Sequence, residues 1–250
     1  MNLDIDLHTH THHSPCGQAE MLPAEIVRTA ARKGITRLAI TDHFYEFTDR
    51  GIFDDIRESV ETVRRSIPNV PEVFFGCEAE VMAPGRTAGS QELADGLDFV
   101  MAGTTHFQNT GVTDLPPGDD ESHAFHFLRV FEYAVGLPWV DVIAHPFFVV
   151  PSVCSVEILD HLRDSDLLPA IEKAKENDVA MEISRRALWP GQTPFSLNFY
   201  KLCKQVGLKF TIGSDAHRLE DVGSVRVLRP FLSELGLSDA DLWLPDHRNS

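Results

Sequence analysis

The regular alternation of short apolar runs with helical segments constrains this fold more than any other feature of the sequence. We expect seven of these runs to be strands: 3–7, 37–41, 73–76, 99–102, 140–144, 179–183 and 209–212. Most are apolar almost throughout, which is typical of strands covered on both faces. Strands that alternate with helices predict a parallel sheet in an α/β protein.

The segments between the strands carry helix signals. The clearest is 24–33, because Pro23 suits a first helical turn and Gly34 ends the helix after two basic residues. Further helices are expected at 54–66, 122–135, 168–177 and 198–206, and loops at 84–90 and 110–121. The alternation continues across both loops. A chain of 250 residues with 43% hydrophobic content suits one barrel, so we expect a single α/β, TIM-like barrel domain over residues 1–250.

The charge and cysteine content narrow the classes of function. A formal net charge of -16 disfavours extended nucleic-acid binding and favours a small-molecule substrate. The chain shows neither a signal-peptide pattern nor an apolar run long enough to span a bilayer, so we expect a cytoplasmic protein that does not bind membranes. Four cysteines without CxxC spacing indicate reduced thiols. Nothing in the sequence sets an oligomeric state.

The residues best suited to chemistry stand at the ends of the expected strands. His8 and His10 follow the first strand, and residues two apart on an extended segment point to the same side. Alone, this pair fits two solvated histidines as well as a metal site. However, six of the seven strand ends carry such residues, namely His8 and His10, His43, Glu78, His106, His145, and Asp215 with His217. The carboxyl ends of barrel strands meet at one end of the barrel, so these side chains are expected to converge.

Imidazole and carboxylate groups are the ligands that zinc, manganese and iron share. Eight of them exceed the needs of one ion, so we expect two or three divalent transition-metal ions, with Glu78 able to bridge two. Asp42 precedes a histidine ligand and is expected to orient a neighbour instead of binding metal. Four further histidines are expected to be satisfied or solvated: His123, His126, His161 and His247.

These motifs resemble the polymerase and histidinol phosphatase (PHP) family. The resemblance rests on His8-x-His10, Thr41-Asp42-His43, Glu78, His106, His145-Pro146 and Ser214-Asp215-Ala216-His217, and it covers nearly the whole chain. It implies a distorted seven-stranded barrel with a multinuclear site that hydrolyses phosphoesters. It also implies a division of the ligands: His8, His10, Glu78 and Asp215 for one ion and its activated water, Glu78, His106 and His145 for a second, and His43 with His217 for a third.

The chain departs from the family pattern shortly after the first motif, where a further Asp or His ligand is common. Gln18 in this segment is a poor substitute. Glu20 is the preferred third-ion ligand because it offers a carboxylate. His13 is second, and Cys16, whose thiolate would select softer metals, is third.

Three arginines are candidates for substrate binding. Arg185 and Arg186 follow the sixth strand, and Arg218 follows the last motif. A guanidinium binds phosphate oxygens in a bidentate manner, although salt bridging on an acidic surface explains these arginines equally well. The expected substrate is a small phosphomonoester such as a nucleotide, a sugar phosphate or histidinol phosphate.

Water activated by metal would attack phosphorus in the expected reaction. One alternative is phosphodiesterase or 3′–5′ exonuclease activity, which the acidic charge disfavours. Another is amide or lactone hydrolysis, since amidohydrolase barrels also open with His-x-His, but there a lysine often bridges the metals where this chain has Glu78. A metal-binding regulatory module is disfavoured because the central motifs are intact.

Overall fold

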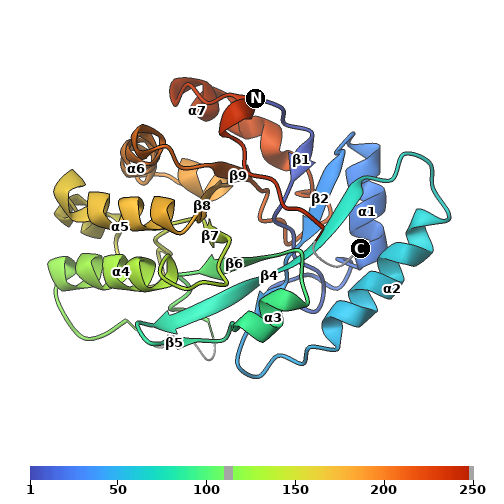
Figure 1. The fold of residues 1–250 in the computed structure, drawn as a ribbon, viewed down its shortest axis with the longest axis horizontal. Coiled ribbons are helices and arrows are strands. Elements are labelled where there is room, and N and C mark those ends of the chain that lie inside the picture. Colours follow the sequence, from blue (N-terminus) through green and yellow to red (C-terminus); the bar gives the residue numbers. More distant parts are fainter. Residues whose placement is uncertain (110–114, 248–250) are drawn as a thin grey trace.

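The computed structural model describes residues 1–109 and 115–247. Seven parallel strands follow one another in the order β1-β2-β4-β6-β7-β8-β9 and curve into a nearly closed barrel (Figure 1). They are β1 (Ile5–Asp6), β2 (Arg37–Ile40), β4 (Glu72–Ala83), β6 (Phe99–Gly103), β7 (Val142–Ala144), β8 (Ala180–Ile183) and β9 (Phe210–Ile212). The predicted α/β barrel is confirmed, while the extent of its domain over residues 1–250 stays a prediction.

Backbone hydrogen bonds beyond the ends of β1 and β9 join the first strand to the last. The Leu7 N–H donates to the Ile212 carbonyl at 2.9 Å, and the Asp215 N–H donates to the His8 carbonyl at 2.9 Å. The His10 N–H continues the series by donating to the Ala216 carbonyl at 3.0 Å. The two segments that carry paired ligand motifs therefore lie side by side, although they stand at opposite ends of the chain.

Strand β4 is much longer than the predicted strand 73–76. From Cys77 to Val81 every second residue is apolar and packs in the core, while Glu78 and Glu80 point to the other side. These two carboxylates are the reason that the predicted strand ends at residue 76, but both lie within β4. Two short strands pair with β4: β3 (His43–Phe44) in parallel and β5 (Arg86–Thr87) in antiparallel.

Strand β5 corrects the predicted loop 84–90, because Gly85 has the φ of 84° that a tight turn back onto β4 requires. In the predicted loop 110–121, residues 110–114 lie outside the described residues and residues 120–121 begin a helix. Regular structure therefore lies within the first of these stretches and at the end of the second.

Helices cover the outside of the barrel, with α1 and α2 on one side and α4, α5 and α6 on the other (Figure 1). The α-helices are α1 (Pro23–Arg32), α2 (Ile52–Arg64), α3 (Gln91–Asp95), α4 (Asp120–Ala134), α5 (Asp164–Glu176), α6 (Thr193–Val206) and α7 (Arg229–Glu234). Short 3₁₀ helices lie at Val156–His161, Arg185–Leu188, Ser224–Leu228 and Asp239–Asp241. The five predicted helices are present within a few residues, and α3 and α7 are additional. Among the described residues, no helix has the length and apolar character needed to cross a membrane.

Apolar side chains fill the amino-terminal end of the barrel. Phe74 and Phe99 are buried there, and Trp243 packs edge-on against the Phe99 ring at 5.4 Å. The Trp243 N–H donates to the Phe210 carbonyl at 2.8 Å, which ties the C-terminal segment to the barrel. The opposite end is left for polar groups, as in other α/β barrels.

Candidate metal centre

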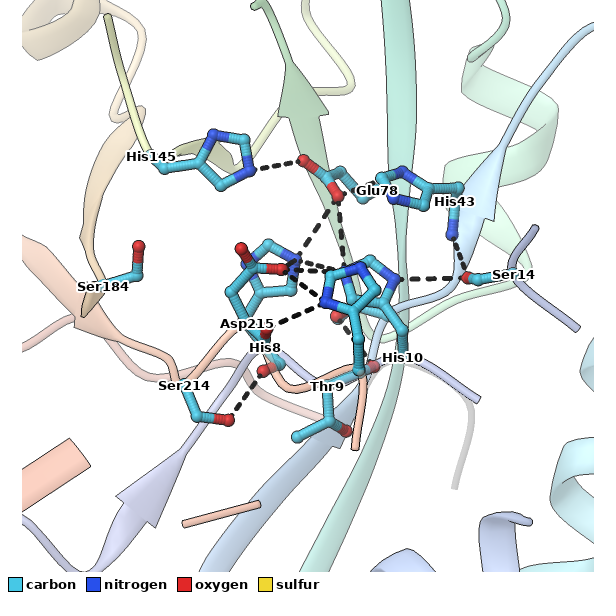
Figure 2. A network of polar contacts seen from close by, with 12 residues as sticks. His8, Thr9, His10, Ser14, His43, Glu78, His145, Ser184, Ser214 and Asp215 are labelled. Carbon is cyan, nitrogen blue, oxygen red and sulfur yellow. Dashed lines mark hydrogen bonds and ion pairs between the residues drawn. The ribbon is translucent and has the colours of Figure 1, made fainter. Parts of the chain in front are cut away.

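The eight predicted ligands converge at the carboxyl end of the barrel, and Figure 2 shows His8, His10, His43, Glu78, His145 and Asp215 among them. Seven are buried and His217 is partly exposed. Their positions follow from the barrel, since each lies in or just after a strand: His8 and His10 after β1, His43 in β3, Glu78 in β4, His106 after β6, His145 after β7, and Asp215 with His217 after β9.

Glu78 lies at the centre of this cluster. Its Oε2 atom is 3.3 Å from His8 Nε2 and 3.2 Å from His43 Nδ1, and its Oε1 atom is 3.1 Å from His145 Nε2. Among the described residues neither carboxylate oxygen accepts a hydrogen bond, so only ion pairs with the surrounding imidazoles offset the cost of burying the carboxylate. Burial raises the pKa of Glu78, but the surrounding imidazoles, that of His106 most strongly, hold it well below its usual range. An anion so placed between imidazole nitrogens fits a bridging metal ligand.

Four overlapping groups of possible ligand atoms lie close enough to hold an ion, with all atoms of each group within 4.8 Å of one another. They are His8, His10 and Glu78; His8, His145 and Asp215; His43, Glu78 and His106; and His10, His43 and His217. The first group contains three of the four members expected for the first ion and lacks Asp215, and the last contains both members expected for the third ion together with His10. His145, expected beside His106, groups with His8 and Asp215 instead.

Two carboxylates beside the cluster were missed at the level of sequence. Glu182 in β8 accepts a hydrogen bond from His8 Nδ1 at 2.7 Å through Oε1, and from the His145 N–H at 2.7 Å through Oε2. Glu80 in β4 lies 3.0 Å from His106 Nδ1. Carboxylates that hold the second nitrogen of a ligand histidine fix its tautomer and orientation. The sequence signal that could have identified both residues is a glutamate within an otherwise apolar strand. A buried carboxylate needs a hydrogen-bond or ion-pair partner, so such a glutamate is expected beside a polar group.

Asp42 and Ser14 hold the first motif from the other side. The Ser14 hydroxyl donates to Asp42 Oδ1 at 2.5 Å and lies 3.2 Å from His10 Nδ1. The Thr11 N–H also donates to Asp42 Oδ1, at 2.7 Å. Asp42 is not a member of the four ligand groups. It helps to orient His10 through Ser14, which contacts both side chains.

The three predicted arginines differ in whether they contact the cluster. Arg186 donates from Nε to Asp215 Oδ2 at 2.6 Å, whereas Arg185 pairs with Asp221 at 2.7 Å. Burial raises the pKa of Asp215, but the Arg186 guanidinium outweighs this effect and the pKa lies well below its usual range. Arg218 is 58% exposed and lies 3.6 Å from Glu220. Only Arg186, of these three, contacts a residue of the cluster directly within the described structure.

The structure does not bring Glu20, the preferred third-ion ligand, to the cluster. Glu20 is exposed after the turn at residues 14–17, and the Gln18 amide donates to it at 2.6 Å in the orientation that satisfies both groups. Cys16 at the same turn does reach the cluster, since it lines the same cavity as His217 and interacts electrostatically with the His217 and His43 imidazoles. Burial raises the pKa of Cys16, but these two imidazoles lower it from 9.0 to about 6. The neighbouring His13 is half-buried and lies outside the four ligand groups.

A cavity of about 620 Å³ opens beside the last motif. Its lining includes Asp215 and His217 from the cluster, the three candidate arginines, Cys16 and Trp189. This volume lies within the range of small-molecule sites in proteins. A substrate could therefore reach the cluster from the side of β8 and β9.

Family models agree with this arrangement. A model described as the PHP domain matches residues 6–149, which contain six of the eight ligands. The chain belongs to the PHP family. A second model, described as PHP-associated, matches residues 200–236 of this PHP-family chain and contains Asp215 and His217.

Several relatives span nearly the whole PHP-family chain. A protein of Caldicellulosiruptor saccharolyticus named "Probable phosphatase" is 27% identical over 234 residues, covering 92% of this chain and 87% of the relative. One of the same name from Vibrio campbellii is 24% identical over 251 residues, covering 96% and 88%.

Two solved structures share the fold. Histidinol phosphate phosphatase from Lactococcus lactis, a complex with zinc, L-histidinol and phosphate, has a TM-score of 0.63, 16% identity and 94% coverage of both chains. Ochratoxinase from A. niger has a TM-score of 0.52 and 9% identity, covering 93% of this chain and 66% of its own. At these identities the similarity concerns the barrel fold.

Proposed function

We propose that this chain is a metal-dependent phosphatase that hydrolyses a small phosphomonoester. The observation that carries the proposal is Glu78, whose two oxygens face imidazole nitrogens without a hydrogen bond, in a cluster whose Asp215 and His217 line a cavity together with three arginines. Several relatives named as phosphatases, and the zinc and phosphate of the Lactococcus lactis enzyme, support it. The net charge of -16 favours a small substrate over an extended nucleic acid.

The donor set fits two or three divalent ions such as zinc, manganese or iron. In this proposal His8, His10, Glu78 and Asp215 would hold one ion, Glu78, His106 and His145 a second, and His43 and His217 a third. Ion-pair distances support the first two sets, since His8 lies near Glu78, His10 near Asp215, and both His106 and His145 near Glu78. His43 and His217 share one ligand group. We assign Cys16, and not Glu20, as the further ligand of the third site, because it lines the cavity beside His217 and interacts electrostatically with the imidazoles of His217 and His43. Such ions lower the pKa of water and stabilise negative charge on phosphoryl oxygens.

The residues of the chain supply position and charge. Glu182 and Glu80 hold His8 and His106 in fixed orientations through their Nδ1 atoms. Arg186 fixes Asp215 through Nε and also lines the cavity, so its guanidinium is placed to bind a phosphate oxygen. A phosphomonoester in the cavity would thus meet Asp215, His217 and Arg186 together.

The proposal is tested by elemental analysis of freshly purified protein, together with phosphate release from a panel of phosphomonoesters before and after chelation. We expect two or three equivalents of metal and chelator-sensitive phosphate release. The variant Glu78→Gln should lose metal and about 10³-fold or more in kcat, since several kcal/mol of charge stabilisation depend on the ions. Glu72→Gln is the matched control, because Glu72 is an exposed partner of Arg37.

The same preparation should be assayed on a phosphodiester and on an amide. Stoichiometric metal with hydrolysis of only the diester or only the amide would contradict the proposal and favour the corresponding alternative activity. Protein that takes up no metal on reconstitution would contradict the assignment of the ligands themselves.

A further inference from the structure

A second cavity lies next to the one that opens on the metal ligands. It has a volume of about 530 Å³ and is bordered by the segment 149–157 together with Trp189 and Pro190. Trp189 lines both cavities. The two spaces therefore adjoin along this one indole, which is 40% exposed.

Aromatic rings connect the metal ligands to the second cavity. The His145 ring meets the Phe148 ring edge-on at 6.1 Å, and Phe148 meets Trp189 edge-on at 5.7 Å. The Arg186 guanidinium lies 4.9 Å from the centre of the Phe148 ring. Phe148 thus supports both the arginine beside the metal ligands and the indole between the cavities.

The segment that carries Phe148 is held in a defined conformation. His145 and Phe147 have φ angles of 25° and 58°, in a region that residues other than glycine rarely adopt. Buried Gln192 fixes the segment, since its Oε1 accepts from the Val149 N–H at 2.9 Å and its Nε2 donates to the Phe147 carbonyl at 3.2 Å. Backbone strain that is maintained in this way is typical of ligand sites.

The second cavity differs in chemistry from the first. Its walls are mainly apolar, from Val149, Pro151, Val153, Val156 and Pro190. Among the described residues that line it there is no lysine or arginine, and Glu157 contributes a carboxylate. A second phosphate group would therefore be repelled, whereas an alkyl or aryl group would bury apolar surface.

We infer that the substrate is a phosphomonoester with an apolar leaving group, an alkyl or aryl alcohol. Its phosphate lies at the metal ligands and Arg186, and its apolar part passes over Trp189 into the second cavity. Hydrolysis breaks the phosphorus–oxygen bond to the alcohol, and water supplies the oxygen of the released phosphate and the proton of the alcohol. The inference rests on the proposed phosphatase activity and adds the class of alcohol.

The test is a series of straight-chain alkyl phosphates from ethyl to octyl, with glucose 6-phosphate as a hydrophilic comparison. Once the chain reaches Trp189, kcat/KM should rise about fourfold for each methylene group that is buried. Trp189→Ala and Val156→Asp should flatten this rise, measured within each variant as the ratio of kcat/KM for octyl phosphate to that for ethyl phosphate. Val227→Ala, which removes another exposed apolar side chain that lines neither cavity, should retain the rise.

Calorimetry on the metal-loaded protein measures the binding of non-hydrolysable methyl- and octylphosphonate. Together with the rates, it distinguishes failure of the apolar-alcohol inference from failure of the phosphatase proposal. Tighter binding of octylphosphonate that is lost in Trp189→Ala supports the inference. Equal rates and equal affinities along the series, with phosphate released throughout, overturn the inference and leave the phosphatase proposal intact. Absence of phosphate release from every ester overturns the phosphatase proposal, and the inference with it.

Discussion

The Nδ1 atom of His8 lies 2.7 Å from Oε1 of Glu182, and both side chains are fully buried. Burial lowers the pKa of His8, but the carboxylates of Glu182 and Glu78 outweigh this effect and raise it well above its usual value. The hydrogen bond assigns Nδ1 to Glu182 and leaves Nε2 facing Glu78, 3.3 Å away. The orientation of the first predicted metal ligand therefore depends on a residue that is far away in the sequence.

Replacing Glu182 by Gln is expected to weaken metal binding. The amide has one acceptor oxygen, so it cannot accept from both His8 Nδ1 and the His145 N–H as the carboxylate does. We expect a loss of about 10- to 100-fold in metal affinity. Competition with a chromophoric chelator measures the affinity, and circular dichroism checks the fold. Unchanged affinity in a folded variant would show that Glu182 does not position His8.

Gly213→Ala is expected to disturb the same pair without removing any polar group. A Cβ atom at position 213 would lie 2.4 Å from Glu182 Oε1 and 2.4 Å from the His8 Cβ, so these side chains must move. We expect metal affinity to fall by about tenfold or more. Gly96→Ala is the control, because its Cβ would meet only the Leu93 carbonyl oxygen, at 3.5 Å. Equal metal affinity in the two variants would contradict this account.

Alkylation of Cys16 in chelator-treated protein should depend on pH in a distinctive way. Because the pKa of Cys16 is lowered to about 6, its reactive thiolate predominates above that pH. The rate with iodoacetamide should rise through pH 6 and level off by pH 7. Burial raises the pKa of Cys154 to about 11, so this thiol should still react slowly there.

Mass spectrometry of the alkylated peptides distinguishes the two cysteines, and Cys16→Ser should abolish the fast phase. Added zinc should protect Cys16 if its thiolate completes the third site. Rapid alkylation of Cys16 in protein loaded with three ions per chain would refute that ligand assignment.

Arg186→Lys is expected to reduce kcat/KM for phosphomonoesters by about 10- to 100-fold, as for the loss of about 1.5–3 kcal/mol of charge-assisted hydrogen bonding. A lysine cannot reproduce the planar donor set that contacts Asp215 and faces the cavity. Arg226→Lys is the control, since Arg226 is 63% exposed and pairs with Asp4. Steady-state kinetics on both variants test this prediction. Equal kcat/KM values for the two variants would show that Arg186 does not bind the substrate.

Removal of metal should lower thermal stability. Ions that bind only the folded chain at 100 times their Kd contribute about 2.7 kcal/mol. For a chain of this size that corresponds to a decrease in Tm of roughly 5–10 °C on chelation. Differential scanning calorimetry measures the change, and re-addition of zinc or manganese should reverse it. An unchanged Tm in protein shown to lose its metal would contradict binding at the buried cluster.

The sequence was sufficient to predict the barrel and the eight converging ligands, because both depend on local patterns. A short apolar run between helices predicts a buried parallel strand, and a histidine or carboxylate at its end lies at the carboxyl rim whatever the register. His8, His43 and Asp215 could be placed in one site for this reason alone.

The tertiary structure decided which side chains support the predicted ligands and which cavity opens beside them. Glu182 and Glu80 looked like ordinary strand residues until the register of β8 and β4 placed them beside His8 and His106. The turn at residues 14–17 likewise brings Cys16 to the cluster and leaves Glu20 outside it. Strand ends are set by periodicity along the chain, whereas these contacts depend on distances between segments that periodicity does not specify.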